Sequence, residues 1–141
     1  MESFSIWHLL ILAIVLLPAI LYILSLQKAF QAVDEPLRPM APGMVWLLLI
    51  PLVNIVWIFF VVIRLKTAYT RMGDAGRLSS PSDAGYRMGM GMAVCAVLSL
   101  IPLIGVLFSL ASLVLWILHW IQVGKARQLV LGAAPTGVRS V

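Results

Sequence analysis

The chain has 141 residues, a formal net charge of +5, 62% apolar residues and only 11% charged residues, whereas soluble domains are about 45–50% apolar and about 25% charged. A chain of this length leaves much of its surface exposed when it folds, so it cannot hide this much apolar surface from water, and a soluble globule is excluded. The basic residues are scattered beside long apolar runs, without the basic helix or aromatic platform that binds nucleic acid, so a bilayer with anionic headgroups is the expected partner.

The first two apolar segments each predict one membrane-spanning helix. Residues 6–26 and 44–63 carry no charged side chain, and each has close to the roughly 20 residues that cross a hydrocarbon core of about 30 Å. The first segment follows Glu2 rather than a basic region, and no clear cleavage site follows it. We therefore expect it to be retained rather than removed as a signal peptide.

A polar connector, residues 64–82, separates these spans from the rest of the chain. At its end, Ser80-Pro81-Ser82-Asp83 matches a helix start, with an N-cap residue, a proline in the first helical position and an acid near the positive end of the helix dipole. The sequence therefore predicts that the third helix begins near Pro81.

The third apolar segment, residues 88–124, is too long for a single crossing. As one helix it would be over about 50 Å long, which exceeds what tilting accommodates. Pro102 lacks a backbone N–H, and Gly105 permits a positive φ. We therefore expect the chain to fold back here, with spans at residues 83–102 and 105–123 that form a tight hairpin.

The complete prediction is an all-α, multi-pass membrane protein with four transmembrane helices, in one domain over residues 1–131 with a flexible tail over residues 132–141. Lys and Arg accumulate on the cytoplasmic side. With four crossings, every basic residue except Lys28 and Arg38 shares a side with both termini, whereas three crossings divide the basic residues evenly. We expect both termini and the connector 64–82 to be cytoplasmic, although Lys28 directly after the first span locally favours the reverse insertion.

The two histidines of the chain are His8 and His119. The four-span topology places both near the cytoplasmic ends of their helices, where they can face each other and bind a metal or relay a proton. Two ligands do not complete a metal site, and Trp7 and Trp120 beside them are typical of the membrane interface. Interfacial residues are therefore the interpretation we favour.

The third predicted span carries methionines and small residues. Met88 and Met92 share a helix face, and thioethers are soft ligands for Cu(I). The stripe of small residues comprises Gly85, Gly89, Gly91 and Cys95. Because small residues let helices approach closely while methionines fill gaps, we favour a role in helix packing over metal binding.

Asn54 is a strongly polar residue deep in the second predicted span. A polar side chain in lipid must find a partner, and Pro51, three residues earlier, leaves the carbonyl of Leu47 without its helical hydrogen bond. We expect Asn54 to join helices or to satisfy this backbone group, and a polar path for transport is the alternative. Residues 49–54 and 100–105 read LIPLVN and LIPLIG, which hints at a duplication, although the flanking sequences do not align.

The run PGMVWLLLIPLVNIVW at residues 42–57 resembles the motif PGxVWLLLIPLxNxVW of a family of small, uncharacterised bacterial integral membrane proteins. The likeness covers about residues 38–129 and includes the Trp116 and Trp120 pair, with His119 standing where the family favours an aromatic residue. The resemblance implies a bacterial inner membrane and carries no activity over to this chain.

Two functions follow as hypotheses. No GxSxG, HExxH, phosphate-loop, dinucleotide-binding or CxxC motif occurs in the sequence, so we expect a non-enzymatic protein without a cofactor. The leading hypothesis is an accessory or assembly component that packs, through the small-residue stripe, with itself or with another membrane protein. The alternative is a small transporter or metal-handling protein that uses Asn54, Met88, Met92, His8 and His119.

Overall fold

The computed structural model describes residues 2–102 and 104–133, and these residues are 81% helical with no strand, which confirms the all-α prediction. The elements are α1 (Glu2–Gln31), the 3-10 helices η1 (Glu35–Leu37) and η2 (Pro42–Leu49), and the α-helices α2 (Pro51–Asp74), α3 (Tyr86–Leu98) and α4 (Gly105–Ala133). Helices α1, α2 and α4 are long and apolar enough to cross a membrane, and α3 is a shorter apolar helix. The prediction of a membrane protein is confirmed at this level.

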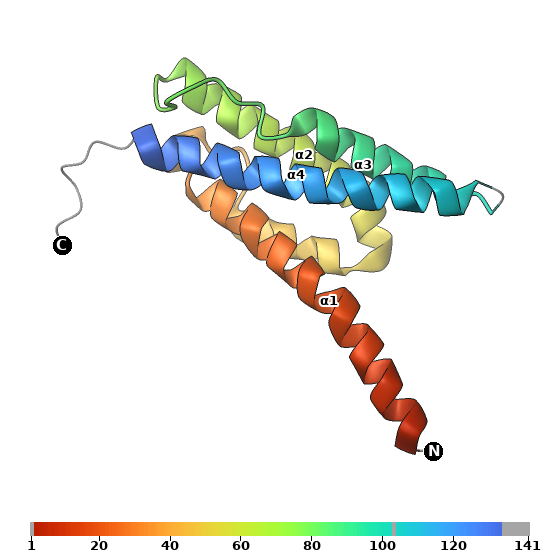
Figure 1. Ribbon diagram of the computed structural model, residues 1–141. Helices are drawn as coiled ribbons and strands as arrows, with labels where there is room; N and C mark the ends of the chain where they lie inside the picture. Colours follow the sequence, from red (N-terminus) through yellow and green to blue (C-terminus); the bar gives the residue numbers. More distant parts are fainter. Residues whose placement is uncertain (1, 103, 134–141) are drawn as a thin grey trace.

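The three long helices end at the same end of the molecule (Figure 1). Between α1 and α2, η2 leads the chain back along α1 before the chain reverses at Ile50. Helix α3 runs antiparallel to α4 and packs along it, while the N-terminal half of α1 projects away from the other helices (Figure 1). We call the end where α1, α2 and α4 finish the basic end, and the end with the turns before α2 and α4 the apolar end.

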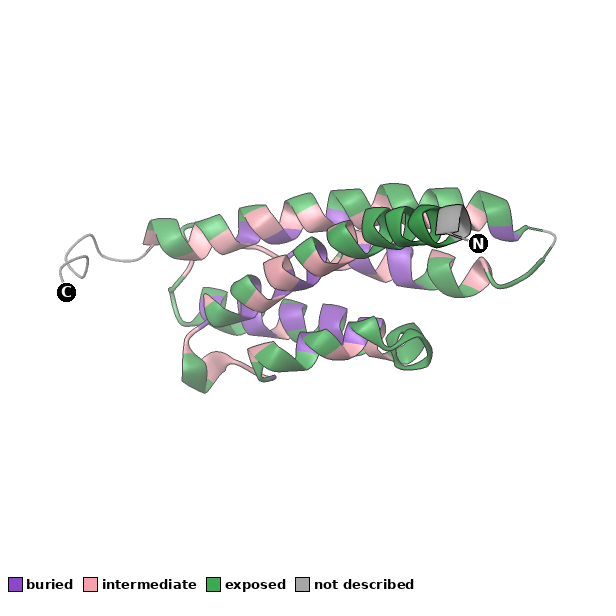
Figure 2. Cartoon of the chain, turned by 90° about the horizontal axis from the view of Figure 1, so that it is seen from below, coloured by how far each residue is buried: buried purple, intermediate pink, exposed green. Residues whose placement is uncertain are grey.

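The burial pattern changes between these two ends (Figure 2). Toward the basic end the chain has a buried apolar core, whose largest fully buried members are Leu26, Phe30, Leu65, Tyr69 and Met72. Toward the apolar end large hydrophobic side chains lie outside instead, with Leu52 83% and Val106 77% exposed. In water, apolar side chains are buried in a core, whereas in a lipid bilayer they can lie on the outside of a helix. This pattern is therefore expected of a chain whose basic end lies in water and whose apolar end lies in lipid.

The second span differs from its predicted bounds of residues 44–63. Residues 42–49 form the 3-10 helix η2, and α2 begins only at Pro51. The proline ring disfavours the α conformation in the residue before it, and Ile50 accordingly has extended backbone angles of φ −86° and ψ 111°. Helix α2 then continues to Asp74, so most of the expected connector 64–82 is helical.

Helix α3 begins at Tyr86, later than the predicted start near Pro81. The hydroxyl of Ser82 accepts a hydrogen bond from the N–H of Ala84, and the carboxylate of Asp83 accepts one from the N–H of Gly85. Ala84 and Gly85 both have positive φ, at 52° and 75°. The polar side chains therefore stabilise a turn rather than a helix start, and α3 has 13 residues, about 20 Å of helix.

The basic end brings together two segments that the four-span topology places on opposite sides of the membrane. Asp34 lies 3.7 Å from Arg77 in an ion pair, and the Tyr69 hydroxyl donates a hydrogen bond to the Ala29 carbonyl. Segments separated by a hydrocarbon core of about 30 Å cannot make these contacts, so that separation is wrong in this fold. Of the predicted tail, residues 132 and 133 belong to α4, and the remainder lies outside the described residues.

Candidate functional site

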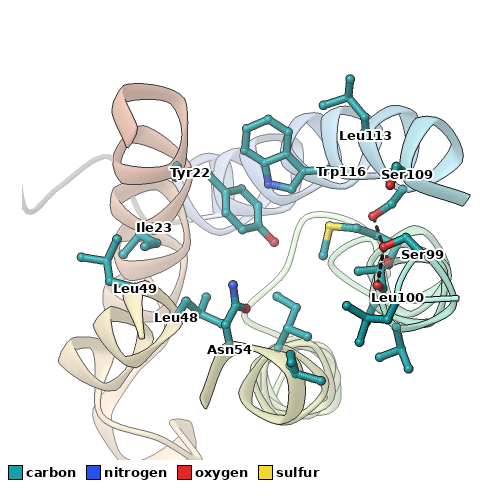
Figure 3. Close-up of a pocket in the computed structure, with 18 residues that line it drawn as sticks. Tyr22, Ile23, Leu48, Leu49, Asn54, Ser99, Leu100, Ser109, Leu113 and Trp116 are labelled. Carbon is teal, nitrogen blue, oxygen red and sulfur yellow. Dashed lines mark hydrogen bonds between the residues drawn. The ribbon is translucent and has the colours of Figure 1, made fainter. Parts of the chain in front are cut away.

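A pocket of about 430 Å³ lies among the helices in the apolar half of the molecule (Figure 3). This volume falls within the range of about 300–1,000 Å³ that is usual for small-molecule sites. Helices α1, η2, α2, α3 and α4 all contribute to the walls, which are mostly aliphatic, and the described lining includes no charged residue. The lining side chains that carry polar atoms are Tyr22, Asn54, Ser99, Ser109, Ser112 and Trp116.

Tyr22 forms the α1 wall of the pocket. Its ring packs edge-on against Trp116, Trp120 and His119 of α4, at centroid distances of 5.4, 6.1 and 6.0 Å. The residue is only 5% exposed, and its hydroxyl has no hydrogen-bond partner among the described residues. Figure 3 shows this hydroxyl pointing into the pocket. A buried polar group without a partner costs about 1–3 kcal/mol, so packing alone does not account for a tyrosine here.

Asn54 lies in the first turn of α2, on the wall opposite Tyr22. Its amide points into the pocket, toward the Tyr22 hydroxyl (Figure 3). The Leu47 carbonyl that Pro51 leaves without a helical partner accepts a hydrogen bond from the backbone N–H of Ile50 at 3.1 Å. Asn54 is therefore not used for that backbone group, and its amide belongs to the pocket instead.

Two serine hydroxyls in the pocket are held by backbone carbonyls. Ser99, the residue that follows α3, donates to the Ala96 carbonyl of α3 at 2.7 Å, and Ser112 of α4 donates to the Met92 carbonyl of α3 at 3.2 Å. Each hydroxyl keeps its lone pairs as acceptors. The Ser112 bond also joins α3 to α4 beside the pocket.

The histidines do not meet. His119 is fully buried in α4, where its Nδ1 lies 3.1 Å from the Gly85 carbonyl oxygen and its Nε2 has no partner among the described residues. His8 lies in the projecting half of α1, about 21 Å along the helix from Tyr22, whose ring contacts His119. The idea of a histidine pair is therefore wrong, and burial also makes His119 a core residue rather than an interfacial one. The described residues include no group of three His, Cys, Asp or Glu placed to hold a metal.

The small-residue stripe faces α4 within the same chain. A Cβ atom added at Gly85 would lie 2.8 Å from Gln122, and one at Gly89 would lie 2.7 Å from the His119 ring. A Cβ at Gly91 would lie 3.2 Å from Leu115. These glycines allow α3 to approach α4 closely, so they are not available as a surface for a second protein.

The remaining candidates on α3, Met88, Met92 and Cys95, differ in how far they are buried. Met92 is buried and lines the pocket, whereas Met88 and Cys95 are only partly buried. Met88 and Met92 therefore have different surroundings, although they share a helix face.

The two LIPL segments occupy corresponding places in the fold. Residues 49–54 form the reversal from η2 into α2, and residues 100–105 lead from α3 into α4. Both reversals point toward the apolar end (Figure 1). The two segments differ at their last two positions, where Val53 and Asn54 correspond to Ile104 and Gly105. A side chain at Gly105 would collide with the Ser99 backbone carbonyl, whereas Asn54 faces the open pocket.

Sequence reasoning identified Asn54 but missed Tyr22 and the serines as members of one site. The only signal for Tyr22 was an aromatic residue within an apolar helix, and such residues are common near membrane interfaces. Only the packing of α1 against α4 reveals its role. No family model, curated protein or solved structure matches this chain.

Proposed function

We propose that the chain is a non-enzymatic integral protein of the bacterial inner membrane, and that it acts as an accessory or assembly component that binds a second copy or another membrane protein. The N-terminal half of α1 carries this proposal. Large apolar side chains over residues 6–17 are exposed, and this half of the helix projects from the bundle (Figure 1). Because helices in a membrane associate by packing faces together, a helix with half its length outside its own bundle offers a contact surface.

The proposed orientation places the basic end in the cytoplasm and the start of α1 on the opposite side. Every Lys and Arg of the described residues lies in the half of the molecule near the basic end, from Lys28 at the end of α1 to Arg127 near the end of α4. Lys and Arg next to spans favour the cytoplasmic side, where they also meet anionic headgroups. This scheme replaces one in which both termini are cytoplasmic.

The depth of each reversal follows from the length of its apolar stretch. In α2 the uncharged part, residues 51–63, is about 20 Å long, which is less than the hydrocarbon core of about 30 Å. The η2–α2 reversal accordingly enters from the cytoplasmic side and turns within the membrane. The uncharged part of α4, residues 105–124, is about 30 Å long, so the α3–α4 hairpin reaches farther across.

Thiol labelling of intact cells and inverted vesicles tests the orientation. In a Cys95→Ser background, Asp34→Cys and Arg77→Cys are both expected to react only from the cytoplasmic side, because these two side chains form an ion pair. Ser5→Cys, at an exposed position near the start of α1, is expected to react only from the periplasm. Labelling of Asp34→Cys from the periplasm would contradict the orientation.

Photo-crosslinking in native membranes tests the assembly role. A photoreactive amino acid at Leu10 of α1 is expected to give one or a few adducts of defined mass, corresponding to a second copy or to another membrane protein. The matched control is Leu110 of α4, which has a similar exposed fraction, 59% against 47% for Leu10, but lies in a helix that packs along α3. Equal, diffuse labelling at both positions would contradict a contact surface on α1.

A further inference from the structure

We propose that the pocket between Tyr22 and Asn54 binds an uncharged carbonyl group attached to an apolar chain. This chemistry is shared by the ester of a membrane glycerolipid and by the ring of a quinone. The inference goes beyond the assembly role, which involves the projecting half of α1 and requires no ligand.

Two hydrogen-bond donors meet in this pocket. The Tyr22 hydroxyl and the Asn54 amide point toward one another from opposite walls (Figure 3), and the hydroxyl is buried without a partner among the described residues. A hydroxyl donates one hydrogen bond and an amide donates two, while a carbonyl oxygen accepts two. A carbonyl oxygen between the two side chains can therefore accept from both of them.

The surroundings select against a charged ligand. The described lining has no Lys, Arg, Asp or Glu, and burying an ion without a counter-charge is far more costly than burying a hydrogen-bonded neutral group. A phosphate or ammonium group is therefore expected to stay outside, while a neutral carbonyl enters. The aliphatic walls, among them Ile23, Ile55 and Leu113, then suit the attached chain.

The position of the pocket explains how such a ligand reaches it. The pocket lies in the half of the molecule whose hydrophobic side chains face outward, and its lining includes Leu49, Leu100 and Leu113, which are 40%, 65% and 51% exposed. A ligand dissolved in the bilayer can therefore enter sideways from the lipid without crossing water.

Photo-labelling of the full-length protein in detergent tests this site. The probe is a phosphatidylglycerol with ester-linked chains and a diazirine in one chain, compared with the same lipid carrying ether-linked chains, which lack the carbonyl. Decylubiquinone serves as the competitor that reports a quinone. The variants are Tyr22→Phe and Asn54→Leu, and the matched control is Tyr69→Phe, because Tyr69 is a buried tyrosine outside the pocket whose hydroxyl bonds to Ala29.

For a glycerolipid, the wild-type protein is expected to bind the ester probe more tightly than the ether probe. Tyr22→Phe and Asn54→Leu are each expected to weaken ester binding by about three- to tenfold, which corresponds to one hydrogen bond. Neither variant is expected to change ether binding, and Tyr69→Phe leaves both unchanged. For a quinone, decylubiquinone displaces either probe, and its affinity falls by a similar factor in Tyr22→Phe.

The proposal is overturned if the wild type binds ester and ether probes equally and decylubiquinone does not displace them. It is also overturned if both pocket variants, eluting as the wild type does, keep wild-type affinity for the ester probe and for decylubiquinone. If Tyr22→Phe does not fold, Asn54→Leu alone decides between these outcomes. Failure of the α1 crosslinks would leave these results unaffected, so the two proposals fail separately.

Discussion

Replacing Gly89 with alanine is expected to destabilise the fold, whereas the same change at Gly124 is expected to stabilise it. Both residues lie within helices, Gly89 in α3 and Gly124 in α4. A Cβ atom at Gly89 would lie 2.7 Å from the His119 ring and 3.0 Å from a methyl group of Val62, while nothing lies within 4 Å of one at Gly124. The two changes therefore share their effect on helix propensity and differ in the space available.

The expected magnitudes follow from this difference. Alanine favours a helix over glycine by about 1 kcal/mol, so Gly124→Ala should raise the free energy of unfolding by about that amount. At Gly89 the same gain is opposed by overpacking of about 1–3 kcal/mol. If the His119 ring moves away, its 3.1 Å contact with the Gly85 carbonyl is also lost, at about 1 kcal/mol. With the loss of this contact counted, the net effect of Gly89→Ala is a loss of about 1–3 kcal/mol, so the two variants should differ by about 2–4 kcal/mol.

Denaturant titration of the purified protein in detergent measures both values. Tryptophan fluorescence is a suitable signal, because the rings of Trp116 and Trp120 are in contact, with centroids 5.5 Å apart and planes tilted by 40°, on the same helix as His119. The free energies of unfolding of both variants are compared with that of the wild type. If Gly89→Ala proves as stable as Gly124→Ala, α3 and α4 do not approach as closely as described, and the reasoning on the small-residue stripe is refuted.

Three further changes test single contacts by the same titration. Arg38→Ala removes charged hydrogen bonds of 2.9 Å to two carbonyls at the end of α1 and should lower the free energy of unfolding by about 2 kcal/mol. Arg38→Lys lacks the forked guanidinium and should recover only part of this loss. An unchanged stability of Arg38→Ala would contradict this capping role. Ser112→Ala removes the hydrogen bond to the Met92 carbonyl and should lower the free energy of unfolding by about 0.6 kcal/mol, which is typical of such bonds between membrane helices. A loss of several kcal/mol would contradict this small contribution. A double-mutant cycle with Asp34→Asn and Arg77→Gln should give a coupling energy below about 1 kcal/mol that decreases as salt is added. The reason is that these two side chains are 42% and 64% exposed. A strong coupling that does not depend on salt would contradict an exposed ion pair.

Much of the architecture could be predicted from local properties of the chain. The all-helical fold and the membrane-spanning character of residues 6–26 follow from apolar composition and length, since lipid requires that backbone groups be satisfied within each helix. The reversal before Pro51 was not among the predictions, because residues 44–63 were expected to form one span. The turn near Pro102 was predicted from the missing N–H of proline. Each of these properties acts within a few residues, so no knowledge of tertiary contacts is needed.

The predictions that failed depend on competition between local and distant contacts. Ser82 and Asp83 match a helix start, but the left-handed backbone of Ala84 and Gly85 uses them in a turn. The small-residue stripe predicts close helix packing without naming the partner helix. In this fold that partner is α4 of the same chain, so its use for assembly could not be judged from residue spacing.

The helical character of the chain, its apolar spans and its turn near Pro102 could be read from neighbouring residues, because hydropathy and proline chemistry are local properties. The proximity of Asp34 to Arg77 and the common pocket of Tyr22 and Asn54 became known only from the folded chain. These pairs are distant in sequence, and their proximity depends on how α1 crosses the later helices. Crossing geometry arises from side-chain packing over whole helices, which no local pattern encodes.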